Sequence, residues 1–456
     1  MDFGRISAKI TCLILLLVAC ANPVLIARAT GSASAGSVHT RVAREASSSG
    51  GNRFGSRPSS VVFALPFDYH IPANRLRDAE TRGNVGYIWG ASAPSARGSS
   101  VIHYYYVDWA NGWCPGLGVT ASCPKGGPPS LPWLEKYHPT WILWQADSKG
   151  NPTRPAQSRI DPGPIVDFTN PQVQRYWMKH YIAPYLRLGF SGIAWDDAFS
   201  TQNYGAVGHF DTHHRFVRMY TGAAAAETWA AAQTRALGDF LRQARAVEPT
   251  VQFGLNSPNE CNYTPPTLWL MPMKYVNTIM DEEGYTFYGN KYPWGPTSEP
   301  GSFCSDRWLF KTTTYIALQK QGKQLILLNE VPGRVVSYMT DTNLTYRAYL
   351  QWALANYYLV KYAHTYFWFG GRQQYGYPVL MQREELANIG RPLGDVFSAQ
   401  GVYLRKYTKG MAIVNPSPNH SFTISLPHGT YQDLYGHNVH KLTMKRHTGI
   451  VLLART

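Results

Sequence analysis

The sequence has few acidic residues. Only 28 of its 456 residues are Asp or Glu, against 43 Lys or Arg, which gives a formal net charge of +15 at pH 7. The basic residues are dispersed and form no nucleic-acid-binding motif, so we expect no nucleic-acid partner. An exported chain with this charge suggests an anionic neighbour, such as an acidic polysaccharide, lipopolysaccharide or phospholipid head groups.

The sequence also lacks a long apolar run after its N-terminal segment. The apolar run at residues 10–19 follows a basic start and is too short to span a bilayer, so residues 1–29 are predicted to be a signal peptide. Two processing sites remain open. A lipobox ending at Cys20 would give a cell-envelope lipoprotein held at the membrane by a lipid anchor, and it is favoured because the apolar run ends there. An A-x-A site at residues 27–29 would give a secreted protein.

Cysteine is scarce, and two of the six cysteines lie in the predicted signal peptide. Four remain, an even number in an exported chain, so we expect two disulfides. Of the three possible pairings we favour those that each close a Gly/Pro-rich loop. No C-x-x-C spacing supports a zinc site, and no cofactor is predicted. The favoured pairs are Cys114–Cys123 and Cys261–Cys304.

The rest of the chain divides into three regions by composition and hydrophobic pattern. Residues 30–60 are rich in Ser, Gly and Ala and are predicted to be a flexible linker. Residues 61–395 alternate apolar strand patterns with helical ones, for example the helices expected at 227–247 and 345–364. Residues 396–456 hold short strands separated by turn signals, which predicts a small antiparallel β-domain.

The alternating region predicts an α/β fold, a (β/α)₈ TIM barrel. A doubly wound open sheet is the alternative, weakened by the lack of G-x-G-x-x-G after the first strand. Residues 61–65 are either a covering strand or the true first strand. The other candidate strands are 85–89, 102–109, 141–146, 192–197, 251–256, 276–281, 324–329 and 365–369.

Carboxylates follow several of these strands. The clearest case is the apolar run Ile193–Trp195, which stops on two adjacent aspartates. In a parallel barrel all such strand ends meet at one face, where function resides. Carboxylates gathered beside aromatic rings predict a glycosidase cleft, because glycoside hydrolysis needs one carboxylic acid and one carboxylate. The acids at or just past strand ends are Asp108, Asp147, Asp196, Asp197, Glu260, Asp281, Glu282, Glu283 and Glu330.

Two motifs carry a resemblance to a known family. The sequence reads G-P-I-V-D-F-T-N-P at 163–171 and G-F-S-G-I-A-W-D-D at 189–197. These resemble the signature of barrel glycosidases of the hypothetical glycosyl-hydrolase-like family fifteen and of polygalactosaminidase-type barrels. The chain differs at Ser191, where those families often have Asp. The resemblance implies that Asp196 is the carboxylate of the fourth strand and that Glu282 or Glu283 is an acid of the sixth, as in alpha-galactosidase-type barrels.

We therefore predict an exported glycoside hydrolase acting on a poly- or oligosaccharide. Asp196 is assigned as nucleophile or base and Glu283 as general acid, with Asp197 and Glu282 in support and Glu330 as a rival for the acid. Three successive acids repel one another, so one of them should keep its proton near neutral pH. The predicted substrate-binding residues are Asp108, Trp109, Trp144, Trp195, Tyr285 and Trp368.

Two other functions remain open. A carbohydrate-binding barrel without catalysis would use the aromatic rings alone, and a metal-dependent polysaccharide deacetylase would need a metal that no clear ligand set supports. The sugar, its linkage and the stereochemical course are not given by the sequence, although the charge suggests an anionic polysaccharide and the resemblance an amino-sugar one.

Overall fold

The computed structural model describes most of the chain after residue 61. The described residues are 62–68, 85–90, 94, 102–108, 130–157, 164–196, 205–256, 268, 270–282, 284–286, 308–330, 344–370, 384–417, 419–427 and 429–455. They belong to one compact unit, Phe54–Thr456. None of the helices among these residues is both long enough and apolar enough to cross a membrane. The predicted signal peptide, the linker and all four cysteines of the predicted disulfides lie outside the described residues.

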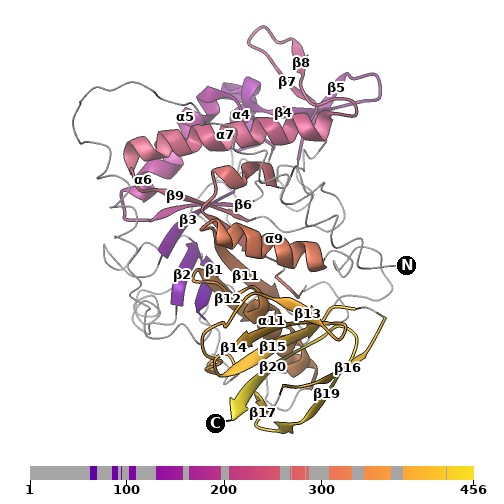
Figure 1. The fold of residues 1–456 in the computed structure, drawn as a ribbon. Coiled ribbons are helices and arrows are strands. Elements are labelled where there is room, and N and C mark those ends of the chain that lie inside the picture. Colours follow the sequence, from indigo (N-terminus) through magenta and orange to yellow (C-terminus); the bar gives the residue numbers. More distant parts are fainter. Residues whose placement is uncertain are drawn as a thin grey trace, which may run out of the picture. The chain divides into compact units, whose positions relative to one another are not determined.

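The centre of this unit is a parallel sheet (Figure 1). Its strands follow the order β1-β12-β11-β10-β9-β6-β3-β2, and β1 also pairs with β2, so the sheet closes into a barrel. Closure at β1 and β12 rests on one register pair, Phe63↔Phe367. A parallel α/β sheet was predicted and is confirmed. The strands are β1 (Phe63–Asp68), β2 (Val85–Gly90), β3 (Ile102–Asp108), β6 (Gly192–Asp196), β9 (Gln252–Asn256), β10 (Thr278–Asp281), β11 (Gln324–Glu330) and β12 (Thr365–Gly370).

The two faces of this sheet bury different side chains. One apolar cluster contains strand residues only and therefore fills the barrel; it includes Ala194, Met280 and Trp368. A second cluster mixes strand residues such as Trp195 with helix residues such as Phe240, and therefore lies outside the barrel. Strand residues alternate between the two clusters, as the pleat requires.

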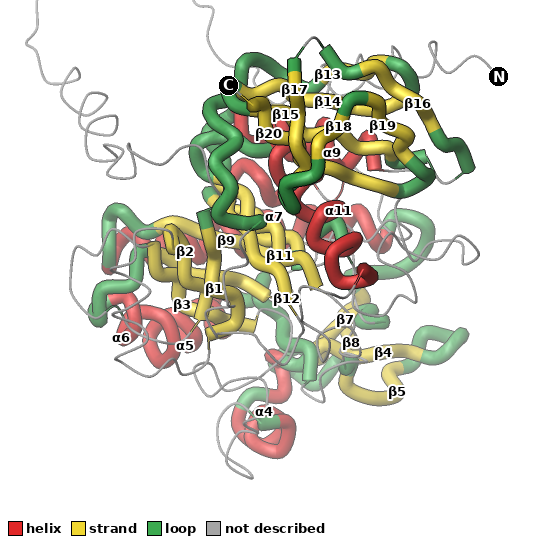
Figure 2. The backbone as a smooth tube through the Cα atoms, turned by 90° about the horizontal axis from the view of Figure 1, so that it is seen from below, coloured by secondary structure: helices red, strands yellow, loops and turns green. Residues whose placement is uncertain are grey.

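Helices cover the outer face of the sheet. The helix α7 (Ala225–Val247) buries one apolar stripe that includes Leu237, Phe240 and Leu241. The helices α9 (Trp308–Lys320) and α11 (Leu344–Val360) precede β11 and β12 in the chain and contact them. Figure 2 shows these helices in red and the strands in yellow. Before β6 the chain forms α4 (Leu131–Tyr137), the 3₁₀ turn η1 (Pro139–Trp141), α5 (Pro171–Trp177), the π turn η2 (Met178–Ile182) and α6 (Ala183–Leu186); η3 (Met271–Lys274) precedes β10.

One predicted barrel strand lies elsewhere. The run at 141–146 forms β4 (Leu143–Ala146), which belongs to a separate four-stranded antiparallel sheet. In the barrel β3 pairs directly with β6, and the eighth strand is β1, which lies between β12 and β2, so residues 61–65 do mark the true first strand. An apolar run predicts a buried strand but does not say which sheet the strand joins. The other strands of the separate sheet are β5 (Pro152–Pro155), β7 (Gly208–Phe210) and β8 (Phe216–Arg218).

After residue 396 the strands are antiparallel. A six-stranded sheet has the order β13-β14-β15-β20-β17-β18, and β16 pairs with β19. Arg405 of β14 donates to the carbonyl oxygens of Leu359 and Lys361, so this sheet caps the C-terminal end of α11. The strands are β13 (Phe397–Ala399), β14 (Val402–Tyr407), β15 (Gly410–Asn415), β16 (Phe422–Ser425), β17 (Thr430–Asp433), β18 (Asn438–Val439), β19 (Lys441–Met444) and β20 (Thr448–Arg455).

Candidate active site

The site is built on the inner face of the barrel at the carboxyl ends of its strands. Along β6, Ile193 and Trp195 belong to the outer cluster and Ala194 to the inner one. Alternation therefore directs Asp196 toward the barrel interior, at the end of the strand. This is the side on which parallel-barrel enzymes place their catalytic groups.

Asn256 joins Asp196 to a second carboxylate. Its side-chain nitrogen Nδ2 donates to Oδ1 of Asp196 at 2.7 Å and to Oε2 of Glu282 at 2.7 Å. Asn256 ends β9, the neighbour of β6 in the sheet, and is 1% exposed. Its own Oδ1 is buried without a hydrogen-bond partner among the described residues. The amide orientation is fixed by chemistry, because an amide oxygen facing two carboxylates would be repelled.

The shared nitrogen limits how far apart the two carboxylates are. Each acceptor oxygen lies 2.7 Å from the same Nδ2, so Oδ1 of Asp196 and Oε2 of Glu282 are at most twice that distance, 5.4 Å, apart. Glycosidases that retain configuration hold their two carboxyl groups about 5–5.5 Å apart, and inverting enzymes about 6.5–9.5 Å apart. For this pair of oxygens the bound is shorter than the separation in inverting enzymes.

Glu330 contributes a third carboxylate at the same edge. It ends β11 and is 0% exposed. Because Ile326 and Leu328 belong to the inner cluster, alternation places Glu330 on the inner face as well. Asp108 is the register partner of Asp196 on the adjacent strand β3. Among the other predicted site residues, Trp109, Asp197 and Glu283 lie outside the described residues, and the side chain of Asp108 is not described.

Three of the predicted substrate-binding rings turn out to be packing residues. Trp195 is 0% exposed and makes edge contacts with Phe240 and Phe253 on the helix side of the sheet. Tyr285 is 1% exposed in the same outer cluster. Trp368 points into the barrel but is 1% exposed within the packed interior. None has a free face on which a sugar ring could stack.

Trp144 is the remaining described ring of that predicted set. It is partly buried in the four-stranded sheet, and it meets Phe210 edge-on with ring centroids 5.2 Å apart. Its indole nitrogen is buried. The ring therefore belongs to the sheet formed by the segments that follow β3 and β6, and not to the barrel wall.

Below the carboxylates the barrel is closed by aromatic side chains and a polar contact network. Tyr104 donates to Oε1 of Gln252 at 2.6 Å and accepts from Thr278. Burial raises the pKa of Tyr104, which keeps the phenol protonated. A Cβ at Gly254 would lie 2.6 Å from the ring of Trp89, so the glycine makes room for this packing. The packed barrel interior therefore lies beneath Asn256.

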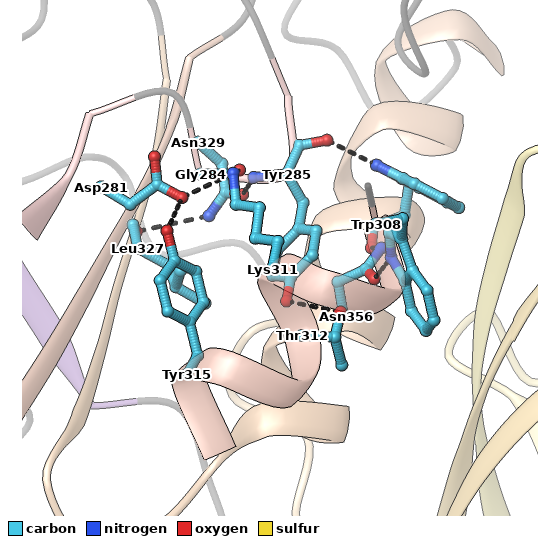
Figure 3. A network of polar contacts seen from close by, with 11 residues as sticks. Asp281, Gly284, Tyr285, Trp308, Lys311, Thr312, Tyr315, Leu327, Asn329 and Asn356 are labelled. Atoms are coloured by element: carbon cyan, nitrogen blue, oxygen red, sulfur yellow. Dashed lines mark hydrogen bonds and ion pairs between the residues drawn. The ribbon is translucent and has the colours of Figure 1, made fainter. Parts of the chain in front are cut away.

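Asp281 faces the opposite way from Glu282. Its Oδ2 lies 2.6 Å from Nζ of Lys311 and accepts from the hydroxyl of Tyr315 at 2.6 Å, both on α9 (Figure 3). Asp281, which was predicted among the acids at the strand ends, therefore packs against a helix instead. Among the described residues no cluster of three or more His, Cys, Asp or Glu could hold a metal ion.

Asn256 was not among the site residues predicted from the sequence. It ends a predicted strand, as the predicted carboxylates do, but the prediction was made from carboxylates and aromatic rings alone. A polar residue at the carboxyl end of any barrel strand is a usable signal, whether or not it carries charge.

No family model matches the sequence, and no curated protein matches it. The structure is similar to solved glycoside hydrolases. The glycoside hydrolase domain of PelA from Pseudomonas aeruginosa is 11% identical, with a TM-score of 0.40, over 68% of this chain and 95% of that one. An Anoxybacillus alpha-amylase is 11% identical, with a TM-score of 0.43, over 88% and 98%. The maltogenic alpha-amylase AmyB from Thermotoga neapolitana is 13% identical, with a TM-score of 0.41, over 87% and 99%.

Proposed function

We propose that the protein is a glycoside hydrolase of the (β/α)₈ class, with Asp196 and Glu282 as its carboxylate pair. The observation that carries the proposal is the single amide nitrogen of Asn256, which lies 2.7 Å from an oxygen of each carboxylate. Two carboxyl groups at this spacing, on a rigid barrel edge, form the minimal machinery for cleaving a glycosidic bond.

In the proposed reaction Asp196 attacks the anomeric carbon while Glu282 donates its proton to the departing oxygen. This forms a covalent glycosyl ester and releases the alcohol of the leaving sugar. Glu282, now ionised, takes a proton from water, and the resulting hydroxyl displaces Asp196 from the anomeric carbon. Because the two carboxyl groups lie close together, the negative charge of one favours the protonated form of the other before substrate binds. Asn256 donates to one oxygen of each carboxylate.

Glu282 takes the acid role in this proposal because its link to Asn256 brings it to Asp196. Our sequence-based assignment of Glu283 remains a prediction, since that residue lies outside the described part of the chain. Glu330 remains a rival, because it is buried on the inner face of β11. Asp108 is proposed to line the substrate site from the register position beside Asp196.

The substrate and location are proposed from the sequence. A net charge of +15 supports an anionic polysaccharide, the resemblance to polygalactosaminidase-type barrels suggests an amino-sugar polysaccharide, and residues 1–29 support export, either as a cell-envelope lipoprotein or as a secreted protein. A C-terminal β-domain at 396–456 is proposed to act as a support, because its strand β14 caps α11.

The test is a hydrolysis screen with the purified protein. Polygalacturonate, alginate, chitosan and polygalactosamine are the probes, soluble starch is the neutral comparison, and new reducing ends are measured. We expect reducing ends from at least one charged polymer and none with Asp196→Asn or Glu282→Gln. Release of acetate without reducing ends, abolished by a chelator, would show a deacetylase instead. Binding without any product, unchanged in Asp196→Asn, would show a carbohydrate-binding barrel.

A further inference from the structure

The segment that carries Glu282 is anchored from its outer side by a buried ion pair. Asp281 is 0% exposed and the Lys311 side chain 8% exposed, with Nζ and Oδ2 2.6 Å apart. Tyr315 donates to the same oxygen at 2.6 Å. Figure 3 shows both partners rising from α9 to meet the end of β10. Buried opposite charges attract strongly, since little water screens them.

Lys311 also reaches the far end of the turn that contains Glu282. Its Nζ donates to the carbonyl oxygen of Gly284, while the amide of Gly284 donates to the carbonyl oxygen of Asp281 at 3.1 Å. Gly284 has a φ of +51°, and a Cβ there would lie 2.6 Å from Oδ1 of Asn329. One ammonium group therefore holds both ends of a turn that only glycine fits well.

The next residue is fixed on three sides. The amide of Tyr285 donates to Oδ1 of Asn329 at 2.9 Å, and its carbonyl oxygen accepts from Nε1 of Trp352 at 2.6 Å. Its hydroxyl lies 3.0 Å from Oγ1 of Thr312. The contacts come from β11, α11 and α9 in turn. Tyr285, which follows the turn of Glu282, is therefore held by one strand and two helices.

We propose that Lys311 is a positioning residue for the general acid. It fixes the backbone on both sides of Glu282, and that backbone aims Glu282 at Asn256 and Asp196. The inference rests on the proposed function and extends it to a residue on the helix side of the sheet. Without the ammonium, the Asp281 carboxylate would be left buried without its counter-charge, and the turn would relax to hydrate it. A shift of about 1 Å at a catalytic group costs on the order of 100-fold in rate.

A role in positioning the acid differs measurably from a role in stability alone. A sugar leaving group must be protonated as its bond breaks, whereas 2,4-dinitrophenolate departs without a proton. Loss of acid positioning should therefore slow cleavage of a polysaccharide and spare a 2,4-dinitrophenyl glycoside. A general loss of folded protein would slow both substrates equally.

The experiment compares variants of the full chain on two substrates: the polysaccharide cleaved best in the screen and the 2,4-dinitrophenyl glycoside of the sugar that it releases. For Lys311→Gln we expect kcat to fall about 100-fold on the polysaccharide and less than about 5-fold on the dinitrophenyl glycoside, with KM little changed. Lys311→Arg should recover most of the loss. Lys320→Gln is the matched control, since Lys320 lies on the same helix in an exposed ion pair with Asp395, and both its rates should stay at the wild-type level.

The outcomes separate the two claims. Equal loss on both substrates, or no loss on either, overturns the role of Lys311 while the glycosidase proposal stands. A wild-type protein that cleaves neither substrate overturns the proposed function and this role with it. If Lys311→Gln does not fold, Tyr315→Phe decides, because it removes one hydrogen bond to Asp281 and keeps the ion pair. Its loss should be smaller, about 3–10-fold, and again confined to the polysaccharide.

Discussion

Asp281 and Glu282 are neighbours in the chain but are held in opposite ways. The carboxylate of Asp281 faces α9, where a lysine ammonium and a tyrosine hydroxyl each lie 2.6 Å away. The carboxylate of Glu282 faces the barrel axis, where the amide of Asn256 donates to it and to Asp196. The outer carboxylate pairs with a charged donor, the ammonium of Lys311. A neutral donor leaves the inner pair able to gain and lose a proton.

The difference shows how one strand end serves two purposes. A pleated strand sends successive side chains to opposite faces, so one residue can lock the strand to its helix while the next enters the site. The outer pair is expected to govern stability and the position of Glu282, and the inner groups are expected to carry out the reaction itself.

The largest effect is expected from Asp196→Asn. Removing the nucleophile should lower kcat by about 1000-fold or more, because no other group on β6 can form the glycosyl ester. The free energy of unfolding should change little, since the amide keeps the shape and still accepts from Asn256. Turnover is measured on the best polysaccharide of the screen and stability by denaturant unfolding. A folded variant with near-wild-type turnover contradicts the assignment.

Asp281→Asn should mainly lower stability. It leaves Lys311 buried without its counter-charge, and breaking a buried pair in this way costs about 3–5 kcal/mol. Urea unfolding measures the loss. Asp239→Asn is the matched control, because Asp239 pairs with Arg242 on an exposed surface and should cost less than about 1 kcal/mol. Equal effects from the two variants would remove the distinction between buried and exposed pairs.

Asn256→Ala should lower kcat by about 100-fold, since both carboxylates lose the donor that sets their spacing. Asn256→Asp keeps the side-chain volume but replaces the donor by a third negative charge, so its loss should be at least as large. Asn415→Ala is the control. The amide of Asn415 is also buried, but it donates to the carbonyl oxygens of Met444 and Lys445 at the end of β19, far from the carboxylate pair in the sequence. It should lower stability and leave kcat unchanged. Full activity of Asn256→Ala would show that the amide does not set the pair.

His447 is also a buried ionisable group but, unlike Asp281, it has no charged partner among the described residues. It is 3% exposed, and neither ring nitrogen has a partner among the described residues. Burial, with Arg446 nearby, lowers its pKa to about 4. The unfolded chain therefore binds a proton more readily than the folded one. Stability is full above pH 6.5 and falls as the pH drops toward 4, by roughly 1–3 kcal/mol.

The measurement is the free energy of unfolding between pH 7 and 4 for wild type and for His447→Asn. His447 has a φ of +47°, a conformation that asparagine also tolerates. Subtracting the two curves removes the titration of carboxylates that both proteins share. The wild type should lose more stability over this range, and parallel curves would show that His447 is not buried in its neutral form.

The sequence predicted the barrel strands well because strands buried on both faces are apolar throughout. The same property hides which face each residue takes. Trp195 and Asp196 were both placed in the site, yet the ring packs on Phe240 and only the carboxylate enters the barrel. An apolar run also carries no information about its partner strand, which is why residues 141–146 were placed in the wrong sheet.

The contacts that define the site depend on separations along the chain that no local pattern encodes. Asn256 contacts Asp196, which is 60 residues away in the sequence, and Lys311 of α9 contacts Asp281 at the end of β10. A lysine within a helix is ordinarily read as a solvated residue, since lysine is rarely buried unless paired. Its role becomes visible only once the helix is packed on the sheet.

The anomeric configuration of the first product tests the central claim most directly. Proton NMR of the reaction in D₂O, recorded before mutarotation, shows whether the released sugar keeps the configuration of the cleaved bond. Oδ1 of Asp196 and Oε2 of Glu282 lie within 5.4 Å of each other, less than the separation in inverting enzymes, so the account predicts retention. Inversion would contradict it, and would show that a more distant carboxylate such as Glu330 works with Asp196.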